Sequence, residues 1–182
     1  MIQITFLEMI LFITAVWILI RGIISFKNKT FNLKREIQLL LVYASIILIV
    51  RCVYFPMHHI NGHIGTLNID LNKILPVKCN LIPIVRLSDI YAGWQINIIG
   101  NIVIFIPVGI IWPVCFKKLN SIWKTTLAGA ALTLCIEITQ ILSYERCSDI
   151  DDIILNTTGA FLGAVIYFSI KKAVNYKKSR KN

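Results

Sequence analysis

The stretch INIIGNIVIFIPVGIIWPVCF, residues 96–116, decides the fold of this chain. It contains no Lys, Arg, Asp or Glu. It is long enough to cross the ~30 Å hydrocarbon core of a membrane, which takes about 20 apolar residues. Pro107 and Gly109 fall inside the run, where we expect them to shape or kink a helix. The stretch therefore predicts a membrane-spanning helix.

Four further apolar runs point the same way: Ile4–Ile24, Ile37–Phe55, Ile122–Leu142 and Ile153–Ile170. Of the 182 residues, 57% are hydrophobic and only 15% are charged, whereas a soluble domain averages about 25% charged residues. We predict an all-α integral membrane bundle of about five transmembrane helices, a multi-pass protein of the cell membrane. Residues 1–182 are expected to form a single membrane domain.

The basic residues predict how the chain is oriented. Fourteen of the 19 Lys and Arg residues lie on one side of the predicted helices, at Arg21, Lys27, Lys29, Lys34, Arg35, Lys117, Lys118, Lys124, Lys171, Lys172, Lys177, Lys178, Arg180 and Lys181. The positive-inside rule then places the N-terminus outside and the C-terminus in the cytoplasm. Residues 57–94 become an outer interfacial loop, in which the alternation of Leu67–Leu71 is a weak strand signal.

Charge and cysteine content exclude several classes of protein. The net charge of +10 would suggest a nucleic-acid partner in a soluble protein, but here the basic residues flank apolar runs, so we expect none. We predict no metal and no cofactor, because the sequence has no Cys/His zinc spacing and no nucleotide-binding motif. Cys79 and Cys147 both fall in predicted outer loops, where a disulfide is possible, although unpaired thiols are favoured.

Polar side chains inside the predicted helices are the candidate functional residues. An ionisable group within the membrane costs about 2.5–3.5 kcal/mol on insertion scales, so it usually faces a partner or a cavity. Glu137 is such a group, and Gln140 follows on the same helical face. Asn97 and Asn101 share a stripe of the preceding helix. These residues either form a site or act only as hydrogen-bonding glue between helices.

The spacing of residues in the last predicted helix indicates which of its side chains face the bundle. Gly159 and Gly163 form a small-xxx-small face that packs on another helix, for which residues 128–131 are the expected partner. Asn156, Asp152 and Asp149 continue the same stripe toward the outer end.

The acids of this stripe also have a purely structural explanation. Ser148 and Asp151 resemble a capping box, which would account for Asp151 and in part for Asp149, but not for Asp152. Arg146, in the short outer loop, could pair with these acids or hold a phosphate or carboxylate.

The assembled residues resemble a known family. The segments NLIPI (80–84), NIIGNIVIFIPVGI (97–110), EITQ (137–140) and RCSDIDDIILNTTGAFLG (146–163) are similar to the VanZ-like family of bacterial membrane proteins. The resemblance covers a core at residues 80–163 and departs at Ile84, where the family more often has Phe. It implies an envelope protein, the founding member being associated with resistance to teicoplanin, a glycopeptide with a lipid tail. Its motif residues here are Asn97, Asn101, Pro107, Gly109, Glu137, Gln140, Arg146, Asp149, Asp152, Asn156, Gly159 and Gly163.

The function expected from these observations is non-enzymatic. The chain would bind or act on an amphiphile at the outer leaflet: a membrane lipid, a lipid-linked cell-wall intermediate or a lipoglycopeptide. Two alternatives stay open. One is an intramembrane enzyme for lipid head groups with Glu137 as general acid or base, and the other is a small proton-coupled transporter.

Overall fold

The computed structural model describes residues 2–29, 32–55, 59–60, 63–69, 79–83, 94–143 and 147–180. The chain forms two compact units. Unit 1 comprises Met1–Pro76 with Leu142–Glu145, and unit 2 comprises Val77–Ile141 with Arg146–Asn182. The expectation of a single domain stays a prediction.

Unit 1 is built on two apolar helices, α1 (Phe6–Asn28) and α2 (Leu33–Tyr54). A capping box at Thr5 and Glu8 begins α1, and Lys29, in the left-handed conformation at φ 50°, ends it. The Arg21 guanidinium and the Glu36 carboxylate form an ion pair that joins the two helices. The short strand β1 (Ile2–Ile4) pairs antiparallel with β4 (Leu67–Ile69), so the weak strand signal is confirmed there. A second short pair joins β2 (His59–Ile60) to β3 (His63–Ile64).

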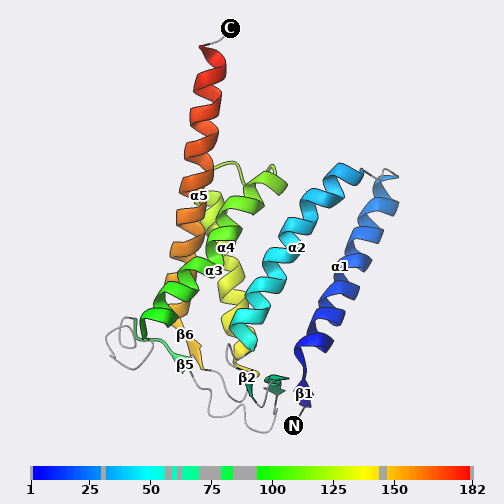
Figure 1. Cartoon of the computed structure of the whole chain (residues 1–182), viewed down its shortest axis with the longest axis vertical. Helices are drawn as coiled ribbons and strands as arrows, with labels where there is room; N and C mark the ends of the chain where they lie inside the picture. The colour runs from blue at the N-terminus through cyan, green and yellow to red at the C-terminus, as the bar shows by residue number, and fades with distance from the viewer. Residues whose placement is uncertain are drawn as a thin grey trace. The chain divides into compact units, whose positions relative to one another are not determined.

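Unit 2 contains α3 (Trp94–Cys115), α4 (Ile122–Gln140) and α5 (Ile150–Ser179). Figure 1 shows α4 running opposite to α3 and α5. Two short parallel strands, β5 (Cys79–Asn80) and β6 (Ser148–Asp149), pair just before α5 begins. This pairing brings the segment before α3 to the same end of the unit as the start of α5.

Glycine decides which helices of unit 2 lie closest. A Cβ added at Gly159 would collide with the carbonyl oxygen of Ile102, and one added at Gly163 with that of Ile106. The glycine face of α5 therefore packs on α3, and the expectation that it packs on residues 128–131 of α4 is wrong. Gly129 of α4 instead accommodates the Ala160 side chain of α5. Close approach of two backbones needs glycine on the contact face, which α3 continues with Gly109.

The all-α fold with five helices is confirmed. Within the described residues, four of the helices are long and apolar enough to cross a membrane: α1, α2, α3 and α5. The shorter α4 is not among these four, and it carries Thr125, Thr126, Thr133 and Glu137 in place of apolar residues. The last helix is longer at both ends than expected, because its polar first turn and its basic last turns are helical too.

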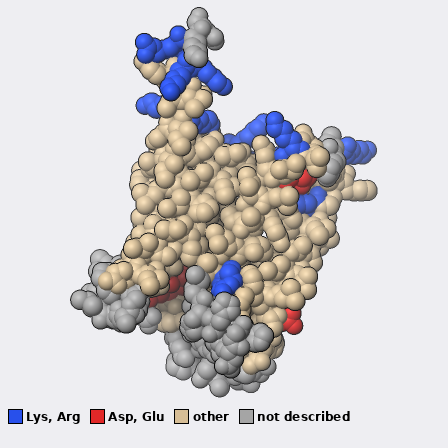
Figure 2. All heavy atoms as spheres, in the orientation of Figure 1, with Lys and Arg blue, Asp and Glu red and all other residues tan. Residues whose placement is uncertain are grey.

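Two other expectations concern the loops and the cysteines. Most of the proposed outer loop at 57–94 lies outside the described residues, as does Arg146. Cys79 and Cys147 are free thiols, as favoured from the sequence. Several Lys and Arg side chains of unit 2 gather at the C-terminal end of α5 (Figure 2), at the opposite end of that helix from Asp149, Asp151 and Asp152.

Candidate functional site

Glu137 lies in the last turn of α4 and is only 2% exposed. Its Oε2 atom accepts the backbone N–H of Asp149 at 2.8 Å. The Gln140 amide nitrogen, oriented toward the same carboxylate, lies 3.2 Å from Oε1 and 3.1 Å from Oε2. The carboxylate therefore joins the end of α4 to the residue that begins α5.

Asp149 is the N-cap of α5. Its Oδ1 atom accepts the backbone N–H of Asp151 at 3.0 Å and the side-chain amide of Asn80 at 2.9 Å. The capping box expected at Ser148 and Asp151 is therefore wrong, because the β5–β6 pairing holds Ser148 in a strand and shifts the helix start by one residue. Asp151 is buried rather than solvated, at 3% exposure.

Asp152 joins α5 to α3. Its Oδ1 atom accepts the Asn101 side-chain amide at 2.6 Å. Asn97, one turn earlier on α3, is exposed and makes no hydrogen bond to any side chain that the structure describes. The acid one turn earlier on α5, Asp149, accepts a hydrogen bond from Asn80 instead. The structure thus brings Asn101, but not Asn97, to the acids.

Asn156 lies one turn deeper than Asp152 and is 2% exposed. Its amide nitrogen donates to the Thr133 hydroxyl at 2.8 Å, which links α5 to α4. Thr133 is four residues before Glu137, so both face α5 from one stripe of α4. Within the described part of the chain the Oδ1 atom of Asn156 has no hydrogen-bond partner.

These contacts gather three acids, which we call the carboxylate cluster: Glu137, Asp149 and Asp152. Glu137 interacts electrostatically with both aspartates. Like charges in a poorly solvated place repel strongly, so a protonated carboxyl or a cationic or hydrogen-bond-donating group is favoured there. Among the described residues no group of three His, Cys, Asp or Glu side chains is arranged to hold a metal ion.

Two residues around the cluster, Asn80 and Thr133, were not singled out from the sequence, and the burial of a third, Asp151, was not expected. Asn80 is the first residue of the NLIPI segment, but only strand pairing brings it to Asp149. Thr133 could have been found from its helical spacing to Glu137 and Gln140. The burial of Asp151 had no signal in the sequence.

Pro107 lies inside α3, which continues through it.

The comparisons with known proteins agree with the resemblance. Protein VanZ of Enterococcus faecium is 38% identical to this chain over 82 residues, which are 45% of this chain and 50% of that protein. The chain thus spans about half the length of the curated relative it matches. No solved structure matches the chain. The VanZ/LLP1 family profile matches residues 40–171, which is wider than the expected core at 80–163 and takes in most of α2. The chain belongs to the VanZ/LLP1 family.

Proposed function

We propose that this membrane protein binds the head group of an amphiphile at the outer leaflet, through the carboxylate cluster and its amide neighbours. The observation that carries the proposal is the gathering of three acids, of which Glu137 and Asp149 are buried, at one end of a membrane unit. Such an arrangement is expensive in a membrane and marks a functional site by default. The close approach of α3 and α5 does not require it, because glycines already bring those two helices together.

The chemistry of the cluster selects the class of head group. Carboxylates accept hydrogen bonds and attract cations, so the cluster favours amino groups and sugar hydroxyls. Asn156 adds a buried acceptor oxygen one turn deeper. A lipid-linked cell-wall intermediate and a lipid-tailed glycopeptide both combine such donors with an apolar chain. Binding either one would affect susceptibility to lipid-tailed glycopeptides.

The test compares Glu137→Gln with the wild-type chain in detergent. The substitution removes the charge and keeps the size of the side chain, so we expect a melting temperature within a few degrees of wild type. Binding of teicoplanin and of a lipid-linked cell-wall precursor is measured by titration, with a glycopeptide that lacks a lipid tail as the comparison ligand. We expect wild-type binding of at least one lipid-tailed probe and a loss of roughly tenfold or more in the variant.

Glu8→Gln is the matched control. It removes the same charge at an exposed capping box, and Gln serves that box as well as Glu does. We expect unchanged binding. A wild-type chain that binds neither probe would refute the proposal, and so would a Glu137→Gln variant that binds as well as wild type.

Catalysis by Glu137 is the second candidate, favoured by its burial beside two other acids. A buried carboxyl near like charges is suited to hold and transfer a proton. In that case the lipid-linked precursor incubated with the wild-type chain is converted to a product that mass spectrometry detects. The Glu137→Gln variant then binds the precursor but leaves it unchanged.

A further inference from the structure

The C-terminal part of α5 extends beyond what a membrane crossing requires. The helix has 30 residues, or about 45 Å at ~1.5 Å per residue, against a hydrocarbon core of ~30 Å. If α5 enters the membrane at its first turn, Lys171 and the residues after it lie at the opposite interface. This end carries Lys171, Lys172, Lys177, Lys178 and Arg180, all exposed.

One face of this end borders a hollow of about 590 Å³. The hollow is lined by Phe168, Lys171, Lys172, Asn175, Tyr176 and Ser179 of α5, and by Asn120 of the α3–α4 connection. The six α5 residues recur at helical spacing, so they form a single stripe. The helix α5 therefore provides one wall of the hollow and the α3–α4 connection the other. The lining side chains present ammonium groups, amides and hydroxyls to it.

The cations of this hollow are positioned rather than merely solvated. The Lys171 ammonium lies 5.7 Å from the Tyr167 ring centre and 5.8 Å from that of Phe168, within the range of cation–π attraction. Behind the other wall, the Lys124 ammonium donates to Oδ1 of Asn120, the residue of the α3–α4 connection that lines the hollow, at 3.0 Å. The α5 lysines thus line the hollow, and Lys124 at the start of α4 adds a positive charge in contact with Asn120.

An apolar surface leads away from the hollow toward the middle of the helices. Trp123 at the start of α4 and Phe161 of α5 lie with ring centres 6.4 Å apart. Both are exposed, as is Leu127 one turn further along α4. A basic hollow that continues into an exposed apolar surface is the arrangement that suits a phospholipid, with its phosphate in the hollow and its acyl chains on the helices.

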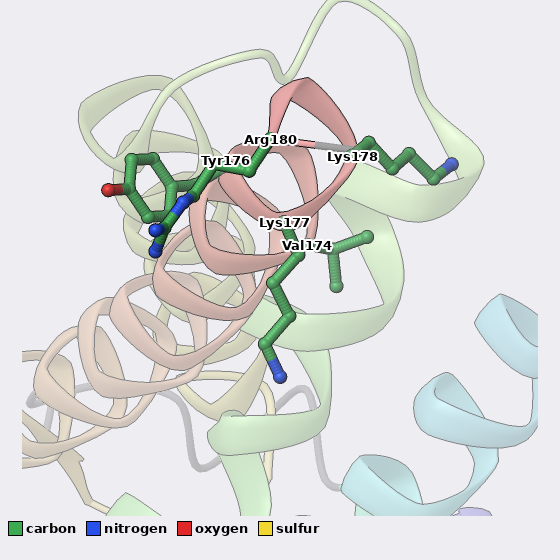
Figure 3. Close-up of a pocket in the computed structure, with 5 residues that line it drawn as sticks. All are labelled: Val174, Tyr176, Lys177, Lys178 and Arg180. Atoms are coloured by element: carbon green, nitrogen blue, oxygen red, sulfur yellow. The ribbon is translucent and has the colours of Figure 1, made fainter. Parts of the chain in front are cut away.

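A second hollow at the same end of α5 is built differently. This second hollow, about 500 Å³, is lined by Val174, Tyr176, Lys177 and Lys178 of α5 and by its C-cap residue Arg180 (Figure 3). Figure 3 shows the Arg180 side chain beside the Tyr176 ring, and the Lys177 and Lys178 side chains pointing apart. Within the described residues no second element lines this hollow.

We propose that the hollow between Asn120 and the Lys171–Lys172 face of α5 binds the head group of an anionic phospholipid, in the leaflet that the basic ends face. Lys171, Lys172 and Lys124 neutralise the phosphate, and the amides of Asn120 and Asn175 donate hydrogen bonds to it. This site lies at the other end of α5 from the carboxylate cluster. It is independent of the function proposed there.

The experiment measures lipid retention by the full chain in mild detergent. Native mass spectrometry follows the binding of phosphatidylglycerol, with phosphatidylcholine as the zwitterionic comparison. The Lys171→Gln/Lys172→Gln double variant is expected to bind phosphatidylglycerol roughly thirtyfold more weakly, from about a fivefold loss per surface lysine. Asn120→Asp, which places a negative charge on the other wall, should also weaken binding several-fold.

The matched control is Lys177→Gln/Lys178→Gln, which removes the same charge from two lysines that line the second hollow and not the first. It should weaken phosphatidylglycerol binding by less than about threefold, and neither double variant should change phosphatidylcholine binding. An equal loss in the two double variants would mean that only the overall charge attracts lipid, and would overturn the site. No loss in Lys171→Gln/Lys172→Gln or in Asn120→Asp would also overturn it.

Discussion

At the scale of single residues, the candidate site consists of acids whose acceptor oxygens meet amide donors on other elements. The Asn80 side chain donates a hydrogen bond to Asp149, and the Asn101 side chain donates one to Asp152. The backbone N–H of Asp149 donates to Glu137. Each of these hydrogen bonds joins an acid to a different segment of the chain. The geometry of the carboxylate cluster therefore depends on these partners.

Removing the Asn101 donor tests this dependence. Asn101→Ala deprives Asp152 of its 2.6 Å amide partner, and we expect a loss of about 1–2 kcal/mol in the free energy of unfolding. Asn101→Asp should cost more, because it places a like charge against Asp152. Asn97→Ala, at an exposed position of the same helix, should stay within about 0.5 kcal/mol of wild type. Detergent unfolding curves measure all three, and equal stability of Asn101→Ala and Asn97→Ala would contradict the assignment.

At the scale of elements, the contact between α3 and α5 determines the geometry of the candidate site. Gly109 and Gly163 face each other, since a Cβ at Gly163 would lie 2.9 Å from the Gly109 Cα atom. This approach aligns Asn101 with Asp152 near one end of the same two helices. α4 then joins through Gly129, Thr133 and Glu137.

Two glycine substitutions separate packing from helix propensity. Gly163→Ala must push back the Ile106 carbonyl group and the α3 backbone, so we expect a destabilisation of about 1–3 kcal/mol. Gly100→Ala is the control, because nothing lies within 4 Å of an added Cβ there. It should be neutral or stabilising by up to about 1 kcal/mol, since alanine favours a helix. Thermal melting in detergent measures both, and a Gly163→Ala variant as stable as Gly100→Ala would show that the helices are not in close contact.

At the scale of the whole molecule, charge is segregated along the helices of unit 2. The connection after α3 carries Lys117 and Lys118, and the parallel helix α5 ends in a basic stretch, whereas the acids lie at the start of α5. In unit 1, Lys27, Lys29 and Lys34 border the connection between its two helices. Positive charge at alternate connections is the pattern that sets orientation in a membrane.

Reporter fusions test the predicted orientation. A reporter that is active only in the cytoplasm should work after Asn182 and fail when inserted within residues 57–94, because the basic connections and the basic C-terminal end stay inside. A reporter active only outside the cytoplasm should give the reverse pattern at both positions, and it serves as the control for expression. Cytoplasmic activity within 57–94 would place the carboxylate cluster at the inner leaflet and reject outer-leaflet binding.

The sequence by itself determined the helices and the polar stripes on them. A helix in hydrocarbon satisfies its own backbone hydrogen bonds, so a charge-free run such as residues 96–116 has few alternatives. Helical spacing likewise placed Asp152, Asn156, Gly159 and Gly163 on one face before any partner was known. Both properties are local.

Only the tertiary structure decided which other segments of the chain pack against those stripes. The glycine face of α5 packs on α3 rather than on α4, and strand pairing brings Asn80 to Asp149. Asp151 is buried, whereas Asn97 is exposed and makes no hydrogen bond to the acids that the structure describes. Each outcome depends on two segments far apart in the chain approaching each other. The period of a helix specifies which of its side chains share a face. Which helix packs against that face depends on how closely the two backbones can approach, and this is a property of the packed unit.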